Sequence, residues 1–176
     1  IINENLKFDV DLFSIDIDGN DYWILEKIPS NISKIFIAEY NSVFGDKFDI
    51  SVPNIKNFSR EKYHHSCLCY GMSLKALIRI MDKKGYYFIG TNSFKNNAFF
   101  INRKFDKKKY FNNLKEFSDS DLKNFTNSTY KESRDKKGKL NFLADDSRLN
   151  EIKDCEIIDF NENGGTLKKI KDLENF

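Results

Sequence analysis

The sequence predicts an α/β fold with parallel strands, a C-terminal antiparallel hairpin and an irregular C-terminal appendage. Apolar runs at residues 12–17 and 35–41 both end in polar side chains, and a helical pattern lies between them. A second helical pattern precedes two further apolar runs, and the chain from residue 106 onward is rich in Lys, Asn and Asp. We therefore expect residues 1–105 to form the α/β region and residues 106–176 to add little regular core.

The composition indicates one globular unit and excludes several classes of protein. The 176 residues are 40% hydrophobic and 32% charged, and no segment is apolar enough for a membrane span or a signal peptide. A net charge of +2 gives no reason to expect a nucleic-acid partner. Cys67, Cys69 and Cys155 suggest reduced thiols in a cytoplasmic protein. Because the chain begins with Ile1 and Ile2, we expect an upstream part of the protein to be missing.

The first two apolar runs form a predicted βαβ unit. A strand at residues 12–17 is followed by a helix that Asn20 or Asp21 can cap and that Pro29 ends. The second strand covers residues 35–41. Strand, helix and strand within about 30 residues imply parallel strands with a right-handed crossover. The carboxyl ends of both strands should therefore meet at the same edge of the sheet.

The remaining elements are predicted from local patterns. Residues 42–69 show no clean period, so we expect a long, partly ordered loop over the sheet edge, of the kind that is often functional. Ser73 begins a helix with one apolar stripe, and the runs at 86–90 and 98–101 form an antiparallel hairpin at the edge of the sheet. In the appendage, residues 155–160 are a plausible strand.

Oxygen-bearing side chains collect at the predicted sheet edge. Asp16, Asp18 and Asp21 follow the first strand, and Glu39 and Asn41 end the second. Adjacent strands lie about 4.8 Å apart, so these groups can converge. They suit Mg²⁺, Mn²⁺ or Ca²⁺, which could orient a substrate hydroxyl and lower its pKa, and one carboxylate could instead be a general base. In a purely structural interpretation, Asp21 caps the helix and Asp18 braces the turn.

The segment 64–69, His-His-Ser-Cys-Leu-Cys, contains both histidines and two of the three cysteines. A structural zinc site typically takes two pairs of ligands separated by a spacer. Cys67 and Cys69 have no second pair near them in the sequence, and Cys155 lies far along the chain. We therefore interpret the segment as a loop carrying buried thiols rather than as a metal site.

Several of these motifs together resemble the second half of FkbM-type methyltransferases, which are S-adenosylmethionine-dependent enzymes with the class I Rossmann-like fold. In that family a strand ending in Asp-x-(Asp/Glu)-Gly precedes a helix and a strand ending in Glu-x-Asn, as in residues 11–22 and 37–41. Residues 71–74, 84–86 and 97–100 are similar to the last helix and closing strand hairpin of the family. The resemblance spans about residues 8–105. It implies a partial Rossmann-like sheet, the C-terminal half of a methyltransferase domain.

The resemblance implies O-methylation of a sugar, glycan or natural-product hydroxyl, with S-adenosylmethionine as cofactor and Mg or Mn as an optional second one. It implies that Asp16 lies beside the reactive end of the cofactor. It also implies that Asp18, Glu39 and Asn41 face the acceptor or a metal. The predicted catalytic residues are then Asp16, Asp18 and Glu39, and Asn41 joins them as a substrate or metal ligand.

The glycine-rich loop and the acid that bind the cofactor in such folds are absent from this sequence. We therefore expect the chain to begin late in the fold and to be half of an enzyme. The implied partner is a small-molecule or glycan acceptor, and we expect neither nucleic acid nor a membrane as a partner. A homo-oligomer is compatible with the sequence.

The first strand also resembles the nucleophile motif of haloacid-dehalogenase-type phosphatases, at residues 16–19. Asp16 would then attack phosphorus and Asp18 would act as acid and base, with Mg²⁺ between them. The acids within residues 143–146 could supply a later acid pair. The segment 39–41 occupies the place where that family has a Ser/Thr-ended strand, so we favour the methyltransferase. A catalytically inactive binding module is a third interpretation.

Overall fold

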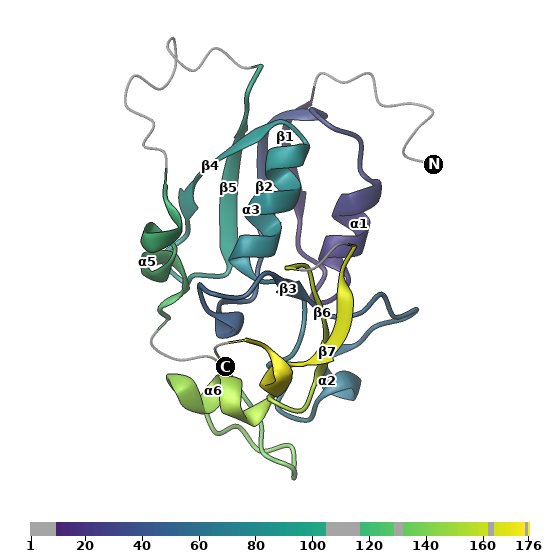
Figure 1. Cartoon of the computed structure of the whole chain (residues 1–176), viewed down its shortest axis with the longest axis vertical. Helices are drawn as coiled ribbons and strands as arrows, with labels where there is room; N and C mark the ends of the chain where they lie inside the picture. The colour runs from purple at the N-terminus through teal and green to yellow at the C-terminus, as the bar shows by residue number, and fades with distance from the viewer. Residues whose placement is uncertain (1–9, 105–116, 129–131, 162–163, 175) are drawn as a thin grey trace.

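The computed structural model describes residues 10–104, 117–128, 132–161, 164–174 and 176, which form a mixed α/β fold with two sheets (Figure 1). The larger sheet has four strands in the spatial order β1 (Val10–Ile15), β2 (Ser33–Glu39), β5 (Asn97–Asn102) and β4 (Tyr86–Thr91). The smaller sheet has three antiparallel strands, β3 (Ile50–Ser51), β6 (Glu156–Asp159) and β7 (Thr166–Lys169). The predicted α/β class is confirmed at this level.

The βαβ unit forms as predicted. Strands β1 and β2 are parallel, with Val10 opposite Ser33 and Ile15 opposite Ala38, and α1 (Asp21–Lys27) connects them. Strand β1 ends two residues earlier than predicted, so the two acids that follow it lie in the turn beyond the strand. Both carboxyl ends therefore lie at the same edge of the sheet.

The predicted hairpin is also present, and it sets the order of the sheet. Strand β5 is antiparallel to both β2 and β4, so the returning strand lies inside and β4 lies at the edge. The helix before the hairpin is α3 (Leu74–Lys83), and the Ser73 hydroxyl accepts a hydrogen bond from the Ala76 N–H at 3.1 Å. Gly85 ends this helix with a φ of +86°, a conformation that favours glycine.

Helices α1 and α3 lie side by side on one face of the larger sheet (Figure 1). Their apolar faces and the inward side chains of the strands make the first core, which includes Leu25, Ile28, Phe36, Ala38, Leu77, Met81 and Phe100. Burial of these side chains explains the one-sided helical stripes in the sequence. Among the described residues, no helix has the length and hydropathy that a membrane crossing requires.

A second core joins the predicted loop to the predicted appendage. From residues 42–69 come η1 (Ser42–Phe44), β3 and α2 (Arg60–Tyr63), and the C-terminal elements are η2 (Asp119–Asp121), α5 (Lys123–Thr126), α6 (Asp146–Glu151), β6, β7 and η3 (Ile170–Asp172). The buried side chains of this core include Phe44, Ile50, Val52, Leu68, Cys69, Ile152, Ile157 and Ile170. The prediction of an irregular appendage with little core is therefore wrong, because strand β3 pairs with β6. The expected strand at residues 155–160 is confirmed as β6.

The two cores are joined by polar contacts through α3. Arg79 of this helix forms an ion pair with the buried Asp49, with 2.7 Å between Nε and Oδ2, and its guanidinium lies 4.5 Å from the ring centre of Phe160. The Ser73 hydroxyl accepts a second hydrogen bond from the Ile50 N–H, at 3.1 Å. Packing thus crosses the boundary that was predicted at residue 105.

Candidate functional site

Three of the predicted acids meet at the carboxyl ends of β1 and β2. One carboxylate oxygen from each of Asp16, Asp18 and Glu39 lies within 4.8 Å of the others, and we call these residues the acidic cluster. Asp16 and Asp18 are exposed, whereas Glu39 is buried. The convergence expected from two parallel strands is therefore present in the structure.

The acidic cluster lines a pocket of about 380 Å³, the acidic pocket. The rest of the lining carries both charges, with Arg60 and Arg134 as cations and Glu61 and Glu132 as further acids, and it includes the polar side chains of Tyr70 and Asn96. Arg134 belongs to the part of the chain predicted to be an appendage, so that part contributes to the pocket. The mixed charges suit a polar ligand better than an apolar one.

Asp21 has a different role from its neighbours. Its carboxylate is buried and accepts hydrogen bonds from the N–H groups of Ile17, at 3.1 Å, and Gly19, at 2.9 Å. Burial raises the pKa of Asp21, the two N–H groups oppose that rise, and the charge of Asp16 adds to it. Asp21 therefore braces the turn, a role that the structural interpretation gave to Asp18, and the side chain of Asn20, the residue before α1, makes no cap hydrogen bond.

Asp18 has a left-handed backbone conformation, and its side chain forms an ion pair with Arg60. Its φ is +56°, in the left-handed region that aspartate tolerates better than most residues. Its Oδ1 lies 2.9 Å from Nη1 of Arg60, on α2. The guanidinium of Arg60 also lies 5.4 Å from the ring centre of Tyr70. Burial, with the charge of Glu39 adding to it, raises the pKa of the Tyr70 hydroxyl well above its usual value, so the hydroxyl stays protonated.

Asn41 does not join the three acids. Its side chain is fully buried, and its Nδ2 donates hydrogen bonds to the backbone oxygens of Leu68, at 2.7 Å, and Tyr70, at 3.0 Å. Its Oδ1 accepts a hydrogen bond from the N–H of Val43 at 3.1 Å. The structure thus gives Asn41 the task of fixing the segment that carries Tyr70 into the pocket wall.

A larger pocket, of about 650 Å³, lies between η1 and α6. It is lined by Asp145 and Asp146 together with Lys123 and Arg148. The described residues that line the acidic pocket include neither Asp145 nor Asp146. The structure therefore does not bring to Asp16 the later acid pair that the phosphatase interpretation uses.

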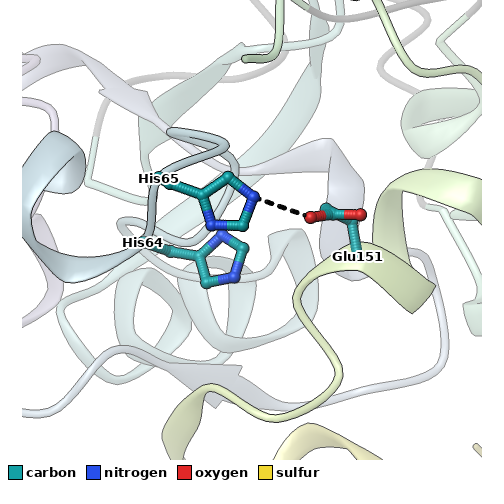
Figure 2. A group of neighbouring side chains, drawn as sticks. All are labelled: His64, His65 and Glu151. Carbon is teal, nitrogen blue, oxygen red and sulfur yellow. Dashed lines mark ion pairs between the residues drawn. The ribbon is translucent and has the colours of Figure 1, made fainter. Parts of the chain in front are cut away.

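Sequence reasoning missed one cluster of potential ligands. Nε2 of His65 lies 2.9 Å from Oε1 of Glu151, the last residue of α6, and His64 lies beside them (Figure 2). The paired histidines were the only signal, and Glu151 lies in a part of the chain for which little core was expected. Nearby, Cys67, Cys69 and Cys155 are buried and make no disulfide, as the interpretation of a loop with buried thiols predicted.

Comparisons of this chain with protein-family models, with curated proteins and with solved structures find no match. The function is therefore inferred from the geometry of the described side chains and from the motifs at the ends of β1 and β2.

Proposed function

We propose that this chain supplies the acceptor side of an S-adenosylmethionine-dependent O-methyltransferase, acting on a sugar, glycan or natural-product hydroxyl. The observation that carries the proposal is the convergence of Asp16, Asp18 and Glu39 at the carboxyl ends of two adjacent parallel strands. Ligands of open α/β sheets bind at such edges. A parallel pair followed by a helix and an antiparallel hairpin is also the order that the FkbM resemblance implies for a partial Rossmann-like sheet.

The acidic cluster has the donor chemistry for Mg²⁺ or Mn²⁺. It offers carboxylate oxygens alone, which these hard cations prefer, and two of its three side chains are exposed to solvent or to an acceptor. A bound cation would orient the acceptor hydroxyl and lower its pKa. Arg60 already pairs with Asp18 and would compete with the cation, so we expect modest affinity.

The other proposed roles in the reaction belong to individual side chains of the acidic pocket. Asp16 is exposed at the end of β1, where its carboxylate can receive the proton that leaves the acceptor hydroxyl. Tyr70, with its raised pKa, contributes a neutral hydroxyl rather than a second negative charge. Arg134 and Asn96 offer hydrogen-bond donors to the oxygens of a polyol acceptor.

The described residues do not by themselves fit the cofactor. Rossmann-like folds bind their cofactor on a glycine-rich strand-to-helix turn. Gly19 lies close to the acidic cluster, but a Cβ at this position would lie 2.4 Å from Cδ1 of Phe58, so the glycine makes room for that ring. The groups that would hold S-adenosylmethionine are not among the described residues.

The cation part of the proposal is tested by calorimetry with Mn²⁺ and Mg²⁺. We expect Glu39→Gln and Asp16→Asn to weaken Mn²⁺ binding more than tenfold, because each removes a ligand. The matched control is Glu26→Gln, an exposed glutamate of α1 outside the cluster, which should leave binding unchanged. An equal response of all four proteins would leave the acids with a structural role only.

The methyl-transfer part is tested with S-adenosylmethionine itself. Calorimetry should detect cofactor binding by this chain, or by the chain extended with any sequence encoded upstream of Ile1. Transfer of a labelled methyl group to a panel of sugars and glycans then identifies the acceptor. If neither form binds the cofactor, the methyltransferase assignment fails, whatever the outcome with Mn²⁺.

A further inference from the structure

A second set of ligand-type side chains lies between the segment that follows α2 and the end of α6. His64, His65 and Glu151, the histidine cluster, each offer one ligand atom, and these atoms lie within 4.8 Å of one another. The two imidazole rings have 4.3 Å between their centres and are tilted by 38°, and the carboxylate lies across from them (Figure 2). Residues far apart in the sequence thus present two nitrogens and an oxygen to one point.

A simple ion pair accounts for only two of these three side chains. His65 and Glu151 are 2.9 Å apart and about one third exposed, at 30% and 35%. The ring centres of His64 and His65 are only 4.3 Å apart, so two protonated imidazoles in this arrangement would repel each other. A cation held between two neutral rings and a carboxylate would account for all three positions.

The buried Ser66 orients the first ring. Nδ1 of His64 and Oγ of Ser66 are 2.8 Å apart, and Oγ also accepts a hydrogen bond from the N–H of Leu68 at 3.3 Å. Nδ1 also accepts a hydrogen bond from the N–H of Ser66 at 3.3 Å, so Ser66 holds this ring through both its hydroxyl and its backbone. Hydrogen bonding at one ring nitrogen commonly fixes the orientation of a histidine that binds a metal through the other.

We propose that His64, His65 and Glu151 bind a divalent transition-metal ion, with Zn²⁺ as the best-matched species. Imidazole nitrogens favour zinc and its neighbours in the transition series, whereas the oxygen-only acidic cluster favours Mg²⁺ or Mn²⁺. Two histidines and one glutamate are a known zinc donor set that leaves a fourth position for water. Ligand atoms about 2.0 Å from a tetrahedral zinc lie about 3.3 Å apart, which small side-chain rotations reach from the observed spacing.

The metal would tie the C-terminal region to one wall of the acidic pocket. Glu151 belongs to α6, and the histidines precede Cys67, Leu68 and Tyr70, which line that pocket. Fixing the histidines therefore restrains the backbone from which the wall is built. This role does not depend on the proposed methyl transfer, because it requires only the second core and its three ligands.

Zinc binding to the whole chain tests the proposal directly. Calorimetry with Zn²⁺ alone should show one equivalent bound, and His64→Ala, His65→Ala and Glu151→Gln should each weaken binding more than tenfold. The matched control is Glu156→Gln, an exposed glutamate of β6, which should bind zinc as the wild type does. Ser66→Ala should weaken binding by roughly 10- to 100-fold through the orientation of His64.

A second measurement uses the wild type and does not depend on whether the variants fold. The chain has only two histidines, so the imidazole ¹⁵N signals in an NMR spectrum report on this cluster alone. Both sets of signals should shift when one equivalent of Zn²⁺ is added. Unshifted imidazole signals at saturating Zn²⁺ would overturn the proposal. Zinc binding that Cys67→Ser or Cys155→Ser abolishes, and that the histidine variants retain, would overturn it as well.

Discussion

The acidic cluster and the histidine cluster each bring three ligand-type side chains together, but by different routes. Asp16, Asp18 and Glu39 come from one βαβ unit, and parallel pairing of neighbouring strands suffices to bring them together. His64 and His65 meet Glu151 only because the C-terminal region packs on residues 42–69 in the second core. A cluster of the first kind can be foreseen from a strand pattern, whereas one of the second kind requires the tertiary structure.

The two clusters also differ in chemistry. The acidic cluster offers only oxygens, the donors that hard cations prefer, and Arg60 and Arg134 in the same pocket make its lining polar. The histidine cluster offers nitrogens and one oxygen, which select softer metals. One chain would then bind two kinds of cation without competition, with a shared wall formed by the segment from His64 to Tyr70.

The largest loss of stability is expected at the ion pair between Arg79 and Asp49, which joins the two cores. Arg79→Met leaves the buried carboxylate of Asp49 without its cation, and we expect a loss of about 3 kcal/mol in the free energy of unfolding. The control is Arg103→Met, whose ion pair with Asp82 is exposed, with an expected loss below about 1 kcal/mol. Chemical denaturation measures both. Equal losses would mean that the contact between the cores is not a significant source of stability.

A smaller loss is expected from the turn that carries the acidic cluster. Asp21→Asn replaces one of two buried acceptor oxygens with an amide, so an N–H in the turn loses its partner. We expect a loss of about 2 kcal/mol in unfolding free energy and weaker Mn²⁺ binding, with zinc binding unchanged. Asp11→Asn, on an exposed side chain of β1, is the control. Weakened zinc binding in Asp21→Asn would show that the clusters are not independent.

The pH dependence of the same variant sharpens this test. The pKa of Asp21 is raised in the folded chain above its ordinary value of 3.8, so the folded state holds this proton more tightly than the unfolded state. The stabilisation from this proton is fully present below pH 3.8 and is lost as the pH rises through the raised pKa. The stability of the wild type relative to Asp21→Asn should therefore fall across that range, in denaturation curves recorded at several pH values. A difference that grows with pH would show that the backbone hydrogen bonds outweigh burial.

The smallest effect is expected at Gly19, beside the acidic cluster. An alanine Cβ would lie 2.4 Å from the ring of Phe58, so the ring must shift, and we expect a loss of about 1 to 2 kcal/mol with weakened Mn²⁺ binding. Gly71→Ala is the comparison, because its φ is +62° but no atom within 4 Å obstructs the Cβ. Backbone strain alone should cost about 1 kcal/mol there. Thermal unfolding and Mn²⁺ calorimetry on both variants separate steric displacement from strain.

Much of the larger sheet could be predicted because its signals are local. A helical pattern separates the apolar run before Asp16 from the apolar run that ends at Glu39, and a polar turn between two further strands marks the hairpin. The role of Asn41 could not be predicted, since its partners are the backbone oxygens of Leu68 and Tyr70. An amide at a strand end has the same sequence signature whether it binds a ligand or fixes a loop.

The sequence by itself determined the βαβ unit, the hairpin and the edge at which Asp16, Asp18 and Glu39 meet, because apolar period and turn residues act over a few positions. Only the tertiary structure decided that residues 42–69 and the C-terminal region share a core, that Asp21 braces a turn, and that Glu151 faces two histidines. Those contacts come from irregular backbone and short strands, whose side chains follow no period. Burial against distant residues fixes their positions, and a one-dimensional pattern does not contain that information.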